Sequence, residues 1–179
     1  MLKGAAGFAV GLAMAPASSF GQDDPTSVRP RAGDLLVKVD DPTLKPLTPA
    51  DIAIGAPPTM VWAMSPEDKT VRNGSRLNRV LLMKMDVQQL GVETKSMAAD
   101  GVVAYTAICT HSGCEIADWL ADEQVLYCSC HLSKFDPKDG ARVVDGPAPR
   151  NLPALPLFTT DGHLVVARGF TSRVGFESA

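Results

Sequence analysis

Apolar and β-branched residues recur along this chain in runs of three to eight residues, and turn-forming residues separate one run from the next. Runs this short, with such boundaries, are typical of strands rather than helices. The predicted strands are Leu35–Val39, Thr59–Met64, Arg79–Met85, Gly101–Ile108, Val125–Tyr127, Arg142–Val144, Leu155–Thr160 and His163–Ala167. Asp161-Gly162, between the last two runs, is a strong hairpin signal. The pattern therefore predicts an all-β fold with antiparallel pairing.

Two segments between these runs have other patterns. Gln88–Ala99 is ambiguous and predicts at most a helical turn, and Pro66–Arg76 contains Asn73-Gly74-Ser75 and predicts a polar loop. Met83 and Met85 lie in a predicted strand, where methionine fills a core far more often than it binds copper. We therefore expect these methionines to be packing residues.

The amino-terminal residues 1–22 read as an export signal, because Lys3 precedes the apolar run Gly4–Ala15, which ends in small residues suited to cleavage. Pro16 interrupts the run before it reaches the roughly 20 apolar residues of a membrane span, which makes an anchor the second interpretation. The start also resembles the tail of a twin-arginine signal whose arginine pair would precede Met1. Residues 23–33 have the composition of a linker, and residues 34–174 are the predicted folded domain.

Charge excludes one class of partner. The net charge is -3, the isoelectric point is near 5.5, and the 17 lysines and arginines are scattered along the chain. No basic stripe is available for a phosphate backbone, so we expect no nucleic-acid partner. The sequence also lacks visible dehydrogenase or hydrolase machinery, and we expect no catalysis from this chain alone.

The residues able to bind a metal are concentrated in two stretches. We call Cys109-Thr110-His111-Ser112-Gly113-Cys114 the first box and Cys128-Ser129-Cys130-His131-Leu132-Ser133 the second box. Together they hold all four cysteines and two of the three histidines. Each box follows a predicted strand, so we expect each to form a loop at the end of that strand. Two such loops can fix a metal with one thiolate and one imidazole apiece.

Three interpretations of the boxes are open. A tetrahedral zinc site takes two cysteines and two histidines, but the arms of common zinc modules carry one ligand type each, whereas both boxes here are mixed. Two disulfides in an exported protein would use all four thiols and leave His111 and His131 unexplained. A binuclear iron–sulfur centre with two thiolates on one iron and two imidazoles on the other uses both ligand types.

The spacing of the boxes resembles one family closely. C-x-H, 16 intervening residues and C-x-x-H form the ligand pattern of Rieske [2Fe–2S] proteins. The fuller C-T-H-x-G-C and C-x-C-H-x-S resemble the iron–sulfur subunit of ubiquinol–cytochrome c reductase. The resemblance implies the Rieske fold, which has antiparallel sheets and a cluster-binding subdomain, about residues 106–152, built at the tip from two loops.

The resemblance also implies a role for each ligand. Cys109 and Cys128 would bind the buried iron, and His111 and His131 the iron nearest the surface. Cys114 and Cys130 would form the disulfide that ties the two loops together. Two further features of the family have counterparts here. The hydroxyl of Ser133 would bond a cluster sulfide, and Gly146–Leu152 resembles the proline loop that covers one side of the cluster.

Some positions depart from the pattern of the reductase subunits. Phe135 stands where they carry a tyrosine that bonds a cysteine ligand, and a phenyl ring donates no hydrogen bond. Ser112, Ser129 and Leu132 replace a usual leucine, proline and glycine. A bulky residue after the second histidine, together with Phe135, is similar to the small subunit of arsenite oxidases. We therefore expect a reduction potential below that of the reductase subunits.

The resemblance implies an exported Rieske protein that relays single electrons as a subunit of an oxidoreductase complex. Its partners would be a periplasmic cytochrome c and a quinol-oxidising or molybdenum-containing subunit, and it would be soluble or membrane-associated in the periplasm. The second hypothesis is the small subunit of an arsenite-oxidase-like molybdenum enzyme. The third, from another class, is a non-redox binding domain cross-linked by zinc or disulfides.

The remaining candidates are expected to have no role in the chemistry. We expect His163, Trp62 and Trp119 to be packing or surface residues, and Asp122-Glu123 to form a solvated turn.

Overall fold

The computed structural model describes Met1 and residues 24–176. The predicted export signal, residues 1–22, therefore lies outside the described residues except for Met1. Across residues 24–176, no helix combines the length and the apolar character that crossing a bilayer requires.

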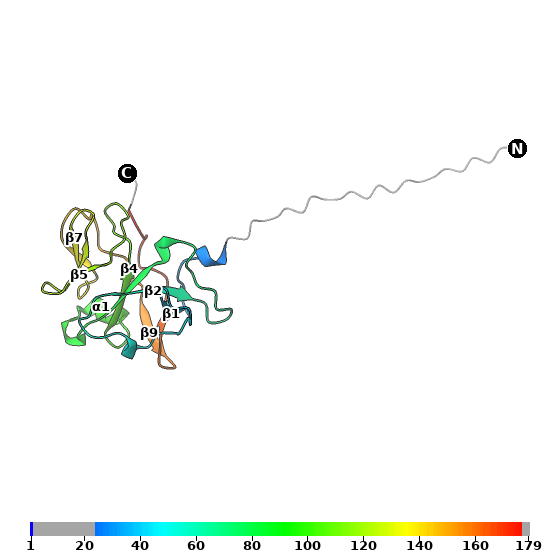
Figure 1. Cartoon of the computed structure of the whole chain (residues 1–179), viewed down its shortest axis with the longest axis horizontal. Coiled ribbons are helices and arrows are strands. Elements are labelled where there is room, and N and C mark those ends of the chain that lie inside the picture. The colour runs from blue at the N-terminus through cyan, green and yellow to red at the C-terminus, as the bar shows by residue number, and fades with distance from the viewer. Residues whose placement is uncertain (2–23, 177–179) are drawn as a thin grey trace.

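The described residues form two antiparallel sheets (Figure 1). The six-stranded sheet has the order β4-β3-β2-β1-β10-β9, and the four-stranded sheet the order β5-β6-β7-β8. Their bounds are β1 Leu35–Lys38, β2 Thr59–Met64, β3 Val80–Lys84, β4 Val102–Thr106, β5 Asp118–Leu120, β6 Val125–Cys128, β7 Ser133–Asp136, β8 Arg142–Asp145, β9 Leu157–Thr160 and β10 His163–Val166. One short helix, α1 (Val92–Met97), and four 3-10 turns, η1 (Pro25–Ser27), η2 (Pro49–Asp51), η3 (Arg76–Asn78) and η4 (Val87–Gln89), complete the described part. The predicted all-β antiparallel fold is confirmed.

The predicted strands all form, with ends that differ by up to a few residues. The β9–β10 hairpin turns at Asp161-Gly162, with His163 opposite Thr160 in the register. The ambiguous segment Gln88–Ala99 contains α1 and most of η4. Two strands, β5 and β7, were not predicted, because β5 is three residues long and β7 (Ser-Lys-Phe-Asp) has no β-branched residue.

The topology places the four-stranded sheet as an insertion in the larger one. β1 near the beginning of the described chain pairs with β10 near its end, with Leu35 opposite Val165. The chain leaves the large sheet after β4, builds β5 to β8, and returns to it at β9. Figure 1 shows β5 and β7 at one end of the molecule and β1 and β9 at the other. Both boxes lie in the inserted part or at its start.

Two apolar cores correspond to this division. One core lies within the large sheet and includes Leu36, Val61 and Leu164. The second contains residues of both sheets, from Leu81 in β3 to Phe135 in β7, and the list of its members includes Cys109 and Cys128. The two cysteines are therefore embedded in the packing that joins the two sheets. Met83 and Met85 are buried in the second core, as predicted.

Residues 24–33, predicted as a linker, are bound to the domain at several points. Gly74 donates its N–H to Thr26 O at 3.0 Å, and the buried amide of Asn78 donates to Val28 O at 2.9 Å. Gly33 N–H donates to Val166 O at 2.9 Å. Because backbone groups of this segment are paired with η3, the preceding loop and β10, the segment is held on the surface of the domain.

A buried ion pair lies inside the segment that was predicted to be a polar loop. The guanidinium of Arg72 donates to both oxygens of Asp34 at 2.5 and 2.8 Å, and both side chains are at most 3% exposed. Hydrogen bonding to Asp34 raises the pKa of Arg72. A bidentate pair of this kind is well satisfied, and removing one partner would leave an unpaired buried charge. The Pro66–Arg76 loop is thus anchored in the interior by Arg72.

Candidate metal centre

The first box is a tight loop that begins three residues after β4. Cys109 N–H donates to Cys114 O at 2.8 Å, and Gly113 N–H donates to Cys109 O at 3.1 Å. These two bonds fold the loop back onto its own start. Gly113 has φ +77°, a left-handed conformation that glycine adopts without steric cost. The local sequence therefore curls the chain so that His111 projects from the loop between its two cysteines.

The second box is the hairpin connection between β6 and β7. Cys128 is the last residue of β6 and is paired with Ser133, the first residue of β7. Leu132 N–H donates to Cys128 O at 2.9 Å, and Leu132 itself has φ +65° with its side chain 59% exposed. A non-glycine residue in this conformation is uncommon and costs free energy. The hairpin places an apolar side chain in solvent directly beside His131.

The fold brings the two boxes together. Cys114 and Cys130 form a disulfide with Cα atoms 6.6 Å apart, which confirms that predicted pair. The ring centroids of His111 and His131 are 4.6 Å apart, with the rings nearly perpendicular at 82°. Cys109 and Cys128 are free and buried. The two imidazoles therefore lie together, and the two buried thiols interact with each other.

The disulfide lies directly against one of the free thiols. The sulfur atoms of Cys114, Cys128 and Cys130 are all within 4.8 Å of one another. Two of these sulfurs are bonded to each other, so this group of three does not offer three thiolates to a metal. The disulfide instead packs beside the Cys128 thiol and holds the two boxes at a fixed separation.

Burial favours the protonated, neutral form of the Cys109 thiol. Burial raises the pKa of Cys109 to about 11, and the adjacent Cys128 shifts this pKa in the same direction. The backbone N–H groups of His111 and Ser112 oppose the shift by hydrogen bonding to the Cys109 sulfur. Thiols of this kind become thiolates when a metal replaces their protons, because metal binding and deprotonation are coupled.

The donor set fits an iron–sulfur cluster. His111 Nδ1 is buried and has no hydrogen-bond partner among the residues that the structure describes, so an imidazole lone pair or N–H is left for a ligand. The Nδ1 atom of His131 lies 3.4 Å from Ser112 Oγ. Two buried thiols with two imidazoles match the mixed thiolate and imidazole ligation of a binuclear cluster.

A third segment, Gly146–Leu152, is hydrogen-bonded to both boxes. Ala148 N–H donates to Ser133 Oγ at 3.1 Å, and Thr110 Oγ1 donates to the carbonyl of Arg150 at 2.6 Å. Gly146 has φ +86°, and a Cβ there would lie 2.5 Å from Ser133 Cα, so only glycine fits. Because the buried Ser133 oxygen accepts from Ala148, its hydroxyl hydrogen is available to donate elsewhere.

Phe135 is completely buried in the core that contains Cys109 and Cys128. The register between β7 and β8 shifts at Lys134/Phe135, which is a bulge of the kind often found next to functional sites. The buried tyrosine of this core, Tyr105, donates its hydroxyl to Pro137 O at 2.8 Å. Burial is the main cause that raises the pKa of Tyr105. The Tyr105 hydroxyl hydrogen is therefore already donated to a backbone carbonyl.

We expect the substitution Phe135→Tyr to raise the reduction potential of the centre. A phenol at this buried position supplies a donor, and a donor near a thiolate stabilises the more negative, reduced state. A hydrogen bond to a charged group is worth about 1.5 kcal/mol, which equals roughly 60 mV for one electron. Protein-film voltammetry of the two proteins measures the shift. Phe158→Tyr on β9, where the ring is already 42% exposed, is the matched control and should leave the potential unchanged.

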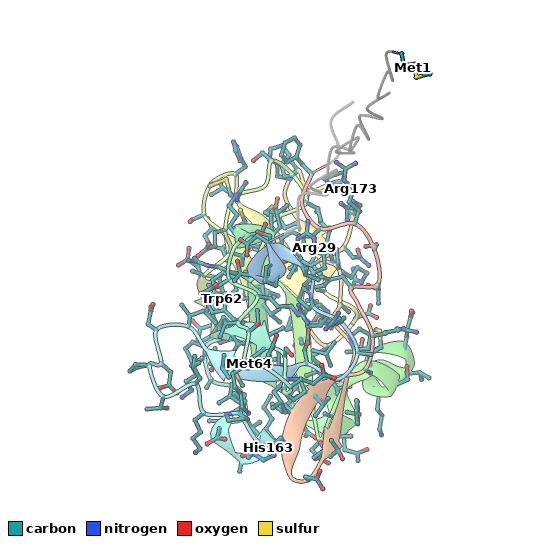
Figure 2. The ribbon with its side chains drawn as sticks, turned by 90° about the vertical axis from the view of Figure 1, so that its right-hand side faces the viewer. Met1, Arg29, Trp62, Met64, His163 and Arg173 are labelled. Atoms are coloured by element: carbon teal, nitrogen blue, oxygen red, sulfur yellow. A yellow bond between two sulfur atoms is a disulfide. The ribbon has the colours of Figure 1, made fainter. Side chains whose placement is uncertain are left out.

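The remaining sequence candidates lie in structural roles. His163 pairs with Thr160 in the β9–β10 hairpin, and Figure 2 shows it at the end of the molecule opposite Arg173. The guanidinium of Arg79 lies 5.2 Å from the Trp62 ring centre. Trp119 lies in β5 and packs against the core between the sheets. Glu123 pairs with Lys134 at 2.7 Å, so the predicted turn carries a surface ion pair.

Three residues make hydrogen bonds that support the boxes and that the sequence pattern does not predict. Thr110 and Arg150 connect the first box to the segment after β8, and Arg76 donates to Gly113 O at 2.6 Å. These contacts join residues 37 and 40 positions apart. Periodicity and spacing report on neighbours in the sequence, so no local signal marks such pairs.

The fold and the site together define a two-sheet β protein whose smaller sheet presents cysteine and histidine donors on two disulfide-linked loops. The family model of the Rieske [2Fe-2S] domain matches residues 61–156, more than half of the chain. The chain belongs to the Rieske [2Fe–2S] domain family, and the cofactor that this domain implies is one [2Fe–2S] cluster.

Several curated relatives resemble the chain. It is 33% identical over 146 residues to the cytochrome bc1 complex Rieske iron-sulfur subunit of Streptomyces lividans, covering 80% of this chain and 85% of that protein. It is 42% identical over 91 residues to a candidate respiratory nitrate reductase Rieske subunit of Haloferax mediterranei, covering 50% of this chain and 40% of that protein. The chain therefore spans less than half of the second relative.

Among solved structures, the soluble domain of Rieske protein II from Sulfolobus acidocaldarius aligns with a TM-score of 0.44 and 24% identity. The alignment covers 56% of this chain and 65% of that one.

Proposed function

We propose that this protein is a one-electron relay, the Rieske iron–sulfur subunit of a complex of the cytochrome bc1 type. The proposal is carried by the pair of adjacent imidazoles, one from each box, together with one free buried thiol in each box. The similarity to the Streptomyces lividans subunit, which spans most of both chains, supports the choice of complex. The folded unit would be residues 34–174, with residues 106–152 as the part that holds the cluster.

The ligands in this proposal are Cys109 and Cys128 for the inner iron and His111 and His131 for the outer iron. The cluster, when bound, supplies the exchange of one electron. Two thiolates and two neutral imidazoles leave it less negative than four thiolates would, which raises the potential from about -400 mV to between roughly -150 and +300 mV. Both thiols lie in the apolar core between the sheets, so the inner side of the site faces nonpolar packing.

The two histidines differ in exposure. His131 is exposed, whereas His111 is partly buried. The tip that carries His131 is therefore where an electron donor such as a quinol would reach the site. Ser133, held by Ala148 N–H, would donate its hydroxyl hydrogen toward a cluster sulfide and favour the reduced state.

The location that follows from this function is the periplasmic side of a membrane, with residues 1–22 serving for export or as an anchor. The disulfide Cys114–Cys130 supports an oxidising compartment, because such bonds persist outside the cytosol. The electron acceptor would be a periplasmic cytochrome c, and the donor a quinol-oxidising subunit.

A second candidate is the small subunit of a molybdenum enzyme of the arsenite oxidase type. The observation that favours it is the exposed Leu132 in a left-handed conformation, beside His131, together with the buried Phe135. The molybdenum content of the complex that purifies with the tagged full chain separates the two candidates. A stoichiometric amount of molybdenum supports the second, and a b-type haem without molybdenum supports the first.

Electron transfer itself is tested by mixing the reduced full-length protein with an oxidised c-type cytochrome in a stopped-flow spectrometer. We expect the cluster colour of the oxidised state to return at a rate that rises with cytochrome concentration. The Cys128→Ser protein, which lacks one thiolate, is the control and should reduce no cytochrome. A wild-type protein that is colourless and contains zinc would contradict the proposal and support a non-redox binding domain.

A further inference from the structure

The last described residues of the chain pack against the first box. The ring of Phe176 lies over Gly113, where a Cβ would meet Phe176 Cδ1 at 3.0 Å. Val174 is buried at 8% exposure, and Gly175 is also buried, while Phe176 remains 46% exposed. The matched family region ends at residue 156, so Arg173–Phe176 lies beyond it.

Hydrogen bonds connect this segment to the cluster loops. The carbonyl of Gly175 accepts from Arg150 Nη2 at 2.5 Å, and the carbonyl of Arg150 accepts from Thr110 in the first box. The first box, the segment after β8 and the C-terminal segment are therefore connected through Arg150.

Arg76, in η3, also contacts Gly113 of the first box. Its Nη1 donates to Gly113 O at 2.6 Å, and its Nη2 lies 3.5 Å from the position of a Cβ on Gly113. Arg76 and the C-terminal residues line the same cavity, of about 370 Å³, together with Leu77 and Ile108. Gly113 is therefore enclosed by a guanidinium and a phenyl ring.

The bond from Arg76 sets the orientation of one peptide unit. In a trans peptide the carbonyl and the following N–H point in opposite directions, so fixing Gly113 O toward Arg76 turns the N–H of Cys114 away from it. The bond also places a full positive charge on a loop that carries two proposed ligands. The positive charge favours the state with more negative charge, which for a cluster is the reduced one.

We propose that Arg76 and the C-terminal residues Val174–Phe176 brace the first box, and that Arg76 is a positioning residue that raises the reduction potential of the site. The inference rests on the proposed ligand set. It assigns Arg76 a role beyond fold stability, because its bond ends on the loop that carries Cys109 and His111. Phe176 contributes by covering Gly113.

The test compares Arg76→Gln, Arg76→Lys and Arg173→Gln in the full-length, cluster-loaded protein. Arg173 lines the same cavity and carries the same charge but is not hydrogen-bonded to the first box, so it is the matched control. We expect Arg76→Gln to shift the ratio of reduced to oxidised protein at a fixed potential about fivefold toward the oxidised form. For one electron this equals roughly 40 mV. Arg173→Gln should shift it less than about twofold, and Arg76→Lys should restore part of the loss.

Voltammetry provides the potential, and visible circular dichroism confirms that each variant is folded and loaded. An Arg76→Gln protein with the wild-type potential overturns the inference. Equal shifts in Arg76→Gln and Arg173→Gln also overturn it, because bulk charge would then explain the effect. Loss of the cluster from the wild-type protein is a different outcome, which contradicts the proposed function rather than the role of Arg76. If Arg76→Gln does not fold, Phe176→Leu is measured instead, and an unchanged potential there counts against the brace.

Discussion

Replacing His131 with cysteine lowers the reduction potential of this protein by more than about 100 mV while a coloured cluster remains bound. The reason is charge. A thiolate in place of a neutral imidazole adds one negative charge to the ligand set, and reduction then adds a further electron to a more negative centre. The exposed position of His131 on the hairpin between β6 and β7 leaves room for the smaller side chain.

The matched control is the same substitution at His163. This third histidine lies in β10, outside both boxes, and His163→Cys should leave the potential and the visible spectrum unchanged. Redox titration followed by absorbance measures both variants. A His131→Cys protein with the wild-type potential would show that His131 is not a ligand, and the proposed assignment of the outer iron would then be wrong.

Removing the disulfide with the double substitution Cys114→Ala and Cys130→Ala lowers the free energy of unfolding by about 3 kcal/mol. The two residues are separated by 16 positions, so the bond closes a loop of moderate length in the unfolded chain. In the folded protein the two boxes are then joined only by noncovalent contacts, which include those of the segment Gly146–Leu152, the core and the pair His111 and His131. We therefore expect faster loss of the cluster as well as lower stability.

Guanidinium denaturation, followed both by far-ultraviolet circular dichroism and by the visible absorption of the cluster, measures these effects. Incubation of the wild-type protein with a reductant is the internal control, because it should reproduce the behaviour of the double variant. The variant itself should not respond to the reductant. Equal stability of the variant and the wild type would show that the surrounding packing, rather than the disulfide, holds the boxes together.

The sequence predicts the fold well where the strands carry their own signal. Thr59–Met64 and the hairpin around Asp161-Gly162 have alternating or β-branched residues and clear turns, and both form as expected. β5 and β7 lack such a signal. β5 has one exposed and two half-buried residues, and it becomes a strand because it pairs with β6. Pairing between strands is a property of the folded chain, which no window of the sequence contains.

The same distinction applies to the site. Cys109, His111, Cys128 and His131 are recognisable because their type and spacing are local, and the structure places the two histidines against each other and the two free cysteines in one buried core. The residues that support them are contributed by distant segments. Arg76 lies in a polar stretch after an Asn-Gly turn, and its neighbour Arg72 is buried against Asp34 although its surroundings in the sequence are hydrophilic. Long-range polar contacts of this kind depend on the tertiary fold and are not visible in composition.

The central claim is that two cysteines and two histidines hold one cluster. Pulsed electron paramagnetic resonance of the reduced full-length protein, labelled with 15N only at histidine, tests this claim most directly. We predict hyperfine couplings from two histidine nitrogens, one of which disappears in His131→Cys while both remain in His163→Cys. A reduced cluster with no coupling to a histidine nitrogen would contradict the account, because the ligands would then be cysteines alone.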